Sequence, residues 1–184
     1  MKNAKNFSIR QMAADSMLAA MCAVLGAVAL DLGNIKITLE SLPIIVGALL
    51  FGPLDGAAIG FVGTFVYQIL RYGISFTTLL WIIPYVVCGL IVGFYAKKQG
   101  YSMSTKQTII LVVIAELVIT TLNTGVMYID SKIYGYYSAV YIFGSLALRY
   151  VICVGKAIVT GAIMPPLVRT LREKVFNTVI YRDI

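Results

Sequence analysis

The stretch Leu42–Gly60 reads LPIIVGALLFGPLDGAAIG and decides how the rest of the chain is interpreted. Its first apolar run ends at Gly52-Pro53, a strong turn signal that Asp55-Gly56 reinforces, and a second apolar run follows directly. We therefore predict two helices joined by a tight turn. The first covers about residues 41–51, and the second rises from residue 56 to about residue 70.

Apolar runs on both sides of this hairpin indicate a membrane protein. Hydrophobic residues make up 60% of the chain and charged residues only 12%, so a soluble domain could not bury this much apolar surface. Six spans of about 20 residues each would leave little of the 184 residues for an aqueous domain. We predict one all-α integral membrane domain over residues 1–184, a compact bundle of six transmembrane helices. The predicted spans are about 11–30, 41–51, 56–70, 76–96, 108–129 and 138–167.

The distribution of Lys and Arg predicts that both termini are cytoplasmic, because cytoplasmic segments near spans retain these residues. With six spans, the three predicted outside cations are Lys36, Arg71 and Lys132. The ten predicted inside cations are Lys2, Lys5, Arg10, Lys97, Lys98, Lys106, Arg169, Arg172, Lys174 and Arg182. This asymmetry explains the net charge of +7 without a nucleic-acid partner. The short second span is the weakest element, and five spans would reverse the side of the C-terminus.

Several chemical classes receive no support from the sequence. The chain has no histidine, and its three cysteines form no CxxC pair, so neither a metal site nor a disulfide framework is indicated. It also lacks a Walker motif, GxSxG and HExxH, so it cannot hydrolyse ATP by itself. We expect no cofactor and no enzymatic activity. The start, MKNAKNFSIR, lacks an obvious cleavage site and is not interpreted as a removable signal.

Three charged residues lie deep inside predicted spans, where a charge costs about 2.5 to 3.5 kcal/mol unless a partner or a ligand meets it. They are Glu116, Arg149 and Lys156. Thr120, Asn123 and Met127 follow Glu116 at helical spacing and continue one polar face. We expect Glu116 to pair with Arg149 or Lys156. These charges either neutralise one another or contribute to a ligand site.

The third and fourth predicted spans bring polar and aromatic groups to the same outer leaflet. The candidate ligand contacts there are Gln68, Arg71, Thr78, Trp81 and Tyr85. Aromatic residues near a membrane interface are also ordinary belt residues. Trp81 and Tyr85 are the stronger candidates because they flank Pro84, beside a backbone that lacks one hydrogen bond. We expect a flat ring to stack there.

Small residues recur every fourth position in three predicted helices. Ala19, Ala23 and Ala27 form a ridge on the first helix, which permits close contact with another helix. Gly56 with Gly60, and Gly89 with Gly93, form similar pairs. We assign both glycine pairs to packing within the bundle.

These features together resemble the substrate-binding S components of energy-coupling factor (ECF) transporters, which are small six-helix membrane proteins of bacteria and archaea. The resemblance covers nearly the whole chain. It is carried by the alanine ridge, the long loop after the first helix, the aromatic fourth helix, the basic termini and, most specifically, LPIIVGALLFGPLDG. The last stretch is most similar to the folate group, in which I-x-L-x-x-L-P-I-I-x-G-x-L-x-F-G-P precedes a glycine-rich third helix.

The resemblance implies a function and a set of partners. The chain would capture folate at the extracellular face of a bacterial plasma membrane as a multi-pass protein of the bilayer. It would then dock on a membrane scaffold, the T component, which carries two separate ATPase subunits. Docking rotates the loaded S component toward the cytoplasm in this family. Ala19 and Ala23 match the AxxxA motif that contacts the scaffold.

For folate, the candidate residues receive chemical roles. Glu116 or Asn123 would read the donor-rich edge of the pterin, because a carboxylate or an amide can do so in a bidentate manner. Trp81 or Tyr85 would stack on its face. Arg149 would serve either end of the ligand. The dianionic glutamyl tail would meet cations near the loops, namely Arg71, Lys36 or Lys132.

Other functions stay open at this point. Pantothenate, thiamine or its precursor, or a queuosine precursor would use the same fold with a different pocket. A stand-alone secondary transporter is a further alternative, although no internal repeat supports it. An intramembrane enzyme that uses Glu116 as acid or base would need a second carboxylate or a nucleophile at matching depth, and none is evident.

Overall fold

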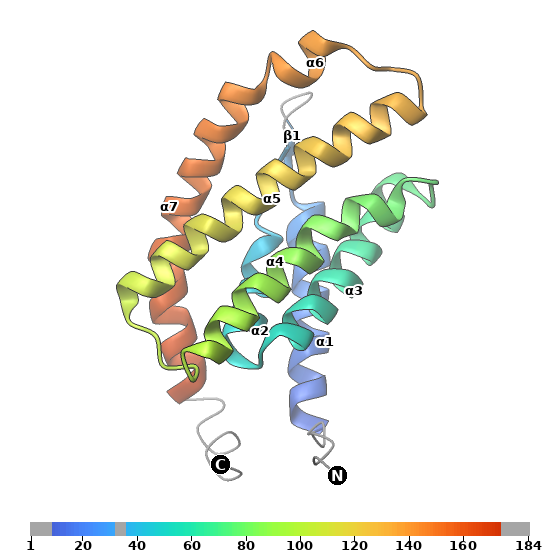
Figure 1. The fold of residues 1–184 in the computed structure, drawn as a ribbon. Coiled ribbons are helices and arrows are strands. Elements are labelled where there is room, and N and C mark those ends of the chain that lie inside the picture. Colours follow the sequence, from blue (N-terminus) through green and yellow to red (C-terminus); the bar gives the residue numbers. More distant parts are fainter. Residues whose placement is uncertain (1–8, 32–35, 174–184) are drawn as a thin grey trace.

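In a computed structural model, the described residues 9–31 and 36–173 form a helical bundle with one pair of two-residue strands (Figure 1). Of Leu30, Asp31 and Lys36 only the backbone is described. The elements are α1 (Ile9–Ala27), β1 (Leu30–Asp31), β2 (Lys36–Ile37), α2 (Ser41–Leu50), α3 (Pro53–Tyr72), α4 (Thr78–Lys98), α5 (Thr105–Ile133), α6 (Ala139–Phe143) and α7 (Leu146–Leu171). Strands β1 and β2 pair antiparallel, with Leu30 opposite Ile37.

Four segments of the described chain are long and apolar enough to cross a membrane. They are Pro53–Tyr72, Thr78–Lys98, Thr105–Ile133 and the combined α6–α7 stretch Ala139–Leu171. Helix α1 has 19 residues, whereas α2 has only ten and would extend about 15 Å, half the thickness of a bilayer core. The number of six spans and the side of each terminus therefore stay predictions.

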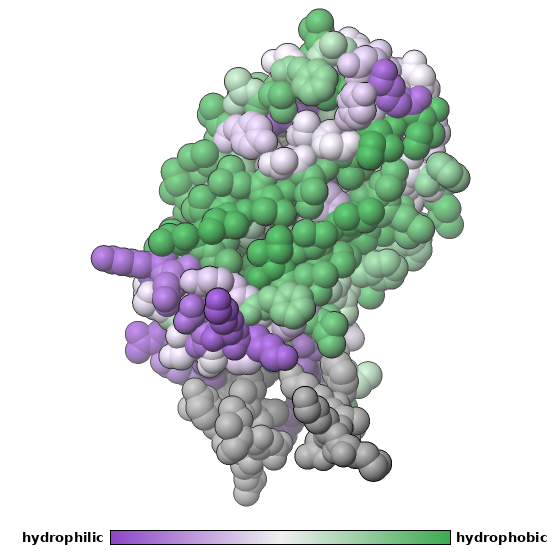
Figure 2. Space-filling model, in the orientation of Figure 1, coloured by the Kyte–Doolittle hydropathy of each residue, from purple (hydrophilic) through white to green (hydrophobic). Residues whose placement is uncertain are grey.

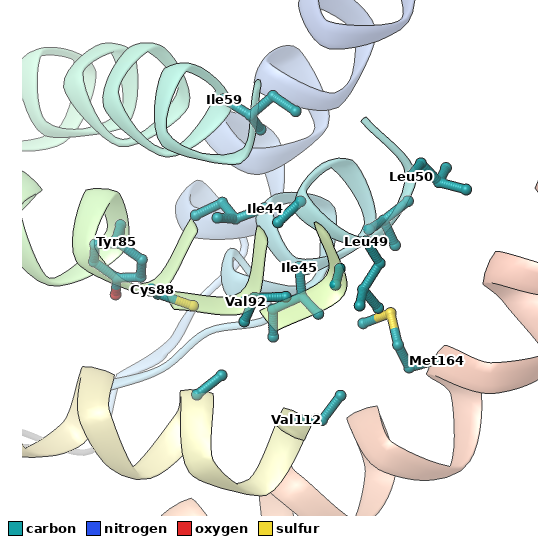
Figure 3. Packing of buried hydrophobic residues seen from close by; sticks show 14 of the residues in the cluster. Ile44, Ile45, Leu49, Leu50, Ile59, Tyr85, Cys88, Val92, Val112 and Met164 are labelled. Atoms are coloured by element: carbon teal, nitrogen blue, oxygen red, sulfur yellow. The ribbon is translucent and has the colours of Figure 1, made fainter. Parts of the chain in front are cut away.

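Helix α2 is the centre of the core, and it is surrounded by protein. Nine of its ten residues are buried, and Ile44 and Ile45 are fully so. Figure 3 shows α2 between side chains of α3, α4, α5 and α7, including Ile59, Val92, Val112 and Met164. The predicted second span is thus a short buried helix. Its apolar composition reflects protein contacts on all sides.

Helices α3 and α4 meet through the two predicted glycine pairs, and this prediction of packing within the bundle is confirmed. A Cβ atom added at Gly89 would lie 2.4 Å from the carbonyl carbon of Gly56. One added at Gly60 would lie 2.9 Å from the backbone oxygen of Tyr85. The two backbones therefore touch, and only glycine fits at these positions.

The last two long helices differ from the sequence-based expectation at their ends. Helix α5 begins with a capping box, in which the Ser104 hydroxyl accepts from the backbone of Gln107, and it runs for 29 residues. The predicted span over residues 138–167 is divided at Gly144 and Ser145 into α6 and α7. Pro165 and Pro166 lie inside α7, which continues to Leu171.

The surface is consistent with a bilayer setting. Figure 2 shows a broad apolar band around the middle of the bundle, with hydrophilic residues gathered at the end where α4 meets α5. Lys97, Lys98 and Lys106 are exposed in that region. Helix α1 begins and α7 ends at this same end, while the β pair and α6 lie at the opposite end (Figure 1). We call the latter the loop end of the bundle.

Candidate functional site

A cavity of about 570 Å³ lies toward the loop end, between the α3–α4 pair and the α5–α7 pair. Its volume falls within the range that is usual for small-molecule sites. The lining is unusually polar for a membrane bundle. Its polar and aromatic side chains are Thr38, Glu40, Tyr67, Gln68, Tyr72, Ser75, Thr77, Trp81, Tyr85, Thr120, Asn123, Asp130, Tyr134, Tyr136, Tyr141, Arg149 and Lys156.

The floor of the cavity is a buried ion pair. Lys156 Nζ lies 2.8 Å from Glu116 Oε2, which confirms the predicted pairing and selects Lys156 over Arg149. Ser41 donates to the other oxygen of Glu116 over 2.6 Å, so the pair ties α2, α5 and α7 together. Lys156 lines the cavity, whereas Glu116 is fully buried behind it. Glu116 therefore holds Lys156 in place at the floor of the cavity. It does not itself face the cavity, although the sequence suggested that it would.

The middle of the cavity holds a second carboxylate, Glu40, which ends the segment after β2. Thr38 donates to Glu40 Oε1 over 3.1 Å, and the Tyr85 hydroxyl donates to the same oxygen. Asn123 Nδ2 in turn donates to the Tyr85 oxygen over 3.4 Å. The other oxygen of Glu40 points toward α1, because a Cβ added at Gly26 would lie 2.8 Å from it. These contacts connect the loop segment to α4 and α5.

The third carboxylate, Asp130, lies one layer closer to the loop end. Trp81 Nε1 donates to Asp130 Oδ1 over 3.3 Å, and the Thr77 hydroxyl donates to the same oxygen. Tyr136, in the loop between α5 and α6, donates to Oδ2. Partial burial and the bond to Asp130 raise the pKa of the Tyr136 phenol, so it stays protonated as a donor. Asp130 therefore joins α4, α5 and the loop over the cavity.

Arg149 provides a cation on the opposite wall. It is partly buried, and its guanidinium contacts Thr124 Oγ1 at 3.5 Å and Met127 Sδ at 2.6 Å. Arg149 and Lys156 are seven positions apart, so both line the cavity from one stripe of α7. The cavity is thus divided, with carboxylates toward α4 and cations on α7.

Seven of the ten predicted ligand contacts line this cavity, namely Gln68, Trp81, Tyr85, Thr120, Asn123, Arg149 and Lys156. The other three do not. Glu116 lies behind Lys156, and Arg71 is exposed near the end of α3. Thr78 is buried, and its hydroxyl accepts from the backbone of Ser75 over 2.8 Å, which stabilises the start of α4.

Three further expectations about individual side chains stay predictions. Trp81 and Tyr85, which were expected to stack on a ring, donate hydrogen bonds to carboxylates. Lys132 Nζ lies 3.6 Å from the centre of the Tyr137 ring, in a cation–π contact. The Lys36 side chain lies outside the described residues.

Glu40 and Asp130 are cavity residues that sequence reasoning missed. Asp130 continues the face of Asn123 and Met127 at a spacing of three residues, so the helical period could have found it. Glu40 stands in DLGNIKITLE, a segment that reads as a polar loop, and no periodic signal marks it.

The sequence could not show whether the alanine ridge of α1 faces another helix of the chain or the surface. Ala19 and Ala23 are buried within the chain, and a Cβ atom added at Gly63 of α3 would lie 2.8 Å from the Ala19 carbonyl oxygen. Ala27 is exposed. In this conformation, Ala19 lies against α3 and Ala23 is buried, and the docking role of the ridge stays a prediction.

Comparisons with known proteins agree on one family. A family model described as "ECF transporter, substrate-specific component" matches residues 10–181. A crystal structure at 2.1 Å of the S-component for biotin from an ECF-type ABC transporter has the same fold, with a TM-score of 0.66. The match has 17% sequence identity and covers 94% of this chain and 95% of that chain. The comparison with curated proteins gives no significant match.

Proposed function

The chain belongs to the family of ECF transporter substrate-specific components, and on that premise we propose that its cavity captures folate for ATP-driven import. Membership makes it a multi-pass membrane protein of a transport system rather than an enzyme. The proposal adds the identity of the substrate, its entry from the extracellular side and its delivery to an energizing module.

The separation of charge across the cavity is the observation that carries the proposal. Glu40 and Asp130 accept hydrogen bonds from Tyr85 and Trp81 of α4, and Arg149 lies on α7. A matching ligand has hydrogen-bond donors at one end and an anion at the other. Folate meets both conditions, because its pterin carries an amino group and a ring N–H, while its glutamyl tail is dianionic.

The roles of single residues follow from where the side chains lie. Asn123 lines the cavity beside Tyr85 and Glu40, so the pterin edge is assigned to its amide. Glu116 is not assigned to the ligand because it is fully buried against Ser41 and Lys156. Arg149 is assigned to a carboxylate of the tail, which a guanidinium can bind through two parallel bonds.

Delivery is proposed to use a membrane scaffold and two ATPase subunits in the bacterial plasma membrane. The loop end, where the cavity lies, would then face the extracellular side. The exposed Lys97, Lys98 and Lys106 at the opposite end support this orientation, because cytoplasmic segments retain such residues.

The deciding experiment identifies the small molecules that stay bound to the purified protein, by mass spectrometry. Calorimetric titration with folic acid, pantothenate, thiamine and biotin follows on the ligand-free protein. We expect a co-purified pterin and the tightest binding for folic acid. A different retained vitamin, with no binding of folic acid, would overturn the substrate assignment and leave family membership intact.

A second substrate has one specific observation in its favour. Two carboxylates and several aromatic rings line the cavity, and a thiamine ring is cationic and aromatic. Arg149 argues against that substrate, since a cation would oppose it. In the same titration, thiamine binding that improves in Arg149→Ala would favour this alternative.

A further inference from the structure

The hydrogen bonds around Tyr85 carry an inference about substrate selection that deepens the proposed function and rests on it. Tyr85 links the carboxylate of Glu40 to the amide of Asn123, and all three side chains line the cavity. A phenol has one proton to donate, whereas a carboxylate can only accept. The single proton of Tyr85 is therefore committed to Glu40.

The hydrogen bond from Tyr85 to Glu40 fixes the orientation of the Asn123 amide. Because the Tyr85 oxygen has already donated its proton, it can only accept from Asn123, and the amide must turn Nδ2 toward it. The opposite orientation would bring two acceptors together, so the assignment of the amide atoms follows from the network. Asn123 Oδ1 must then point away from Tyr85.

The amide oxygen that results has no partner. Asn123 Oδ1 is buried, and the described residues offer it no hydrogen bond. A buried acceptor without a donor is costly, and a ligand that supplies an N–H removes the cost. Because Asn123 lines the cavity, a ligand bound beside it can supply the missing donor.

We propose that Asn123 determines specificity for a heterocycle with an exocyclic amino donor, and that Glu40 and Tyr85 are positioning residues that hold its amide oxygen toward the ligand. The selected group in folate is the 2-amino group. Glu40 acts through Tyr85 without touching the ligand. A heterocycle of equal size that lacks the amino donor leaves Oδ1 unpaired and binds more weakly.

The test compares folic acid with its 2-desamino-2-methyl analogue, which has nearly the same shape and the same tail but no amino donor. Calorimetric titration of the purified full-length protein gives the ratio of the two affinities. We expect the wild-type protein to prefer folic acid by about tenfold or more, the usual consequence of an unpaired buried polar group.

Variants locate the origin of this preference. In Tyr85→Phe and in Glu40→Leu the amide is released, so the preference should fall to about threefold or less even where both affinities change. Asn123→Leu should abolish it, whereas Asn123→Asp retains an acceptor and should keep it. Gly125→Ala is the matched control, since Gly125 lies on α5 with nothing within 4 Å of an added Cβ atom. Thermal unfolding of each variant verifies that it folds.

The outcomes separate the two proposals. A wild-type protein that binds folic acid and its analogue equally well, or a Tyr85→Phe variant that keeps the full preference, overturns the role of this network and leaves folate as the substrate. Pterin and 2-desamino-2-methylpterin repeat the comparison without the glutamyl tail. A wild-type protein that binds neither folic acid nor pterin contradicts both proposals together.

Discussion

Glycines have opposite surroundings in the α3–α4 pair and in the α5–α7 pair of this bundle. In α3 and α4, Gly56, Gly60 and Gly89 bring the two backbones into contact. In α5 and α7, an added Cβ atom at Gly125 or Gly155 meets no atom of the described residues within 4 Å. The α3–α4 pair is therefore held together by backbone contact, and we call it the closed half. The α5–α7 pair, the open half, contacts it through side chains around the cavity. The polar residues of the cavity lie along the seam between the two halves.

The floor of the cavity gives the largest expected effect, because it joins the halves. In Lys156→Met, Glu116 remains fully buried without its cation, and the free energy of unfolding should fall by about 3 to 5 kcal/mol. Thermal unfolding in detergent measures the loss. The double variant Glu116→Gln with Lys156→Met removes both charges and should recover most of the stability. A double variant as unstable as the single one would show that the pair does not act as a unit.

Gly89→Ala tests the closed half. The new Cβ atom would lie 2.4 Å from the backbone of Gly56, and we expect a loss of about 3 kcal/mol as the helices separate. The matched change in the open half, Gly155→Ala, should raise the stability by up to about 1 kcal/mol through helix propensity. Equal melting temperatures for the two variants would contradict the contrast between the halves.

Arg149→Ala should separate binding from folding in the open half. The guanidinium contacts Thr124 and Met127 in the bundle, and Arg149 lines the cavity. Losing a charged hydrogen-bond partner of the ligand should weaken folic acid by about 10- to 100-fold, while the melting temperature changes little. Calorimetry and thermal unfolding on one preparation decide this, and unchanged affinity would remove Arg149 from the ligand site.

Tyr136→Phe should have the smallest effect, at the loop end of the seam. It removes one of three donors to Asp130 and leaves those from Thr77 and Trp81 in place. A hydrogen bond to a carboxylate contributes about 1.5 kcal/mol at the low end, so ligand dissociation should accelerate about tenfold. Stopped-flow displacement of bound ligand gives the rate. A dissociation rate equal to that of the wild-type protein would show that this loop does not restrain the ligand.

The sequence predicted those features that depend on one helix at a time. Hydropathy located the long helices, and helical spacing placed Thr120 and Asn123 on one face and Arg149 and Lys156 on one stripe. Charge deep in an apolar span predicted the ion pair of Glu116, because lipid offers no alternative partner.

Features that depend on the packing of several elements could not be predicted from the sequence. Glu40 reaches the cavity only because the segment after β2 folds back toward α4 and α5, and a polar loop carries no period. A ridge of alanines has the same pattern whether it faces a neighbour or the surface, so the burial of Ala19 and Ala23 within the chain could not be predicted. The break between α6 and α7 at Gly144 is also invisible to hydropathy, since both sides are apolar.

The encapsulation of α2 has a consequence for biogenesis. A ten-residue segment is too short to halt in the membrane on its own, so it must enter together with α3 as one hairpin. Leu49 and Met164 belong to one core cluster, and Met164 is among the last residues of the bundle to leave the ribosome. Chains truncated before α7 should therefore expose an unfinished interior, which makes them substrates for membrane quality-control proteases until synthesis is complete.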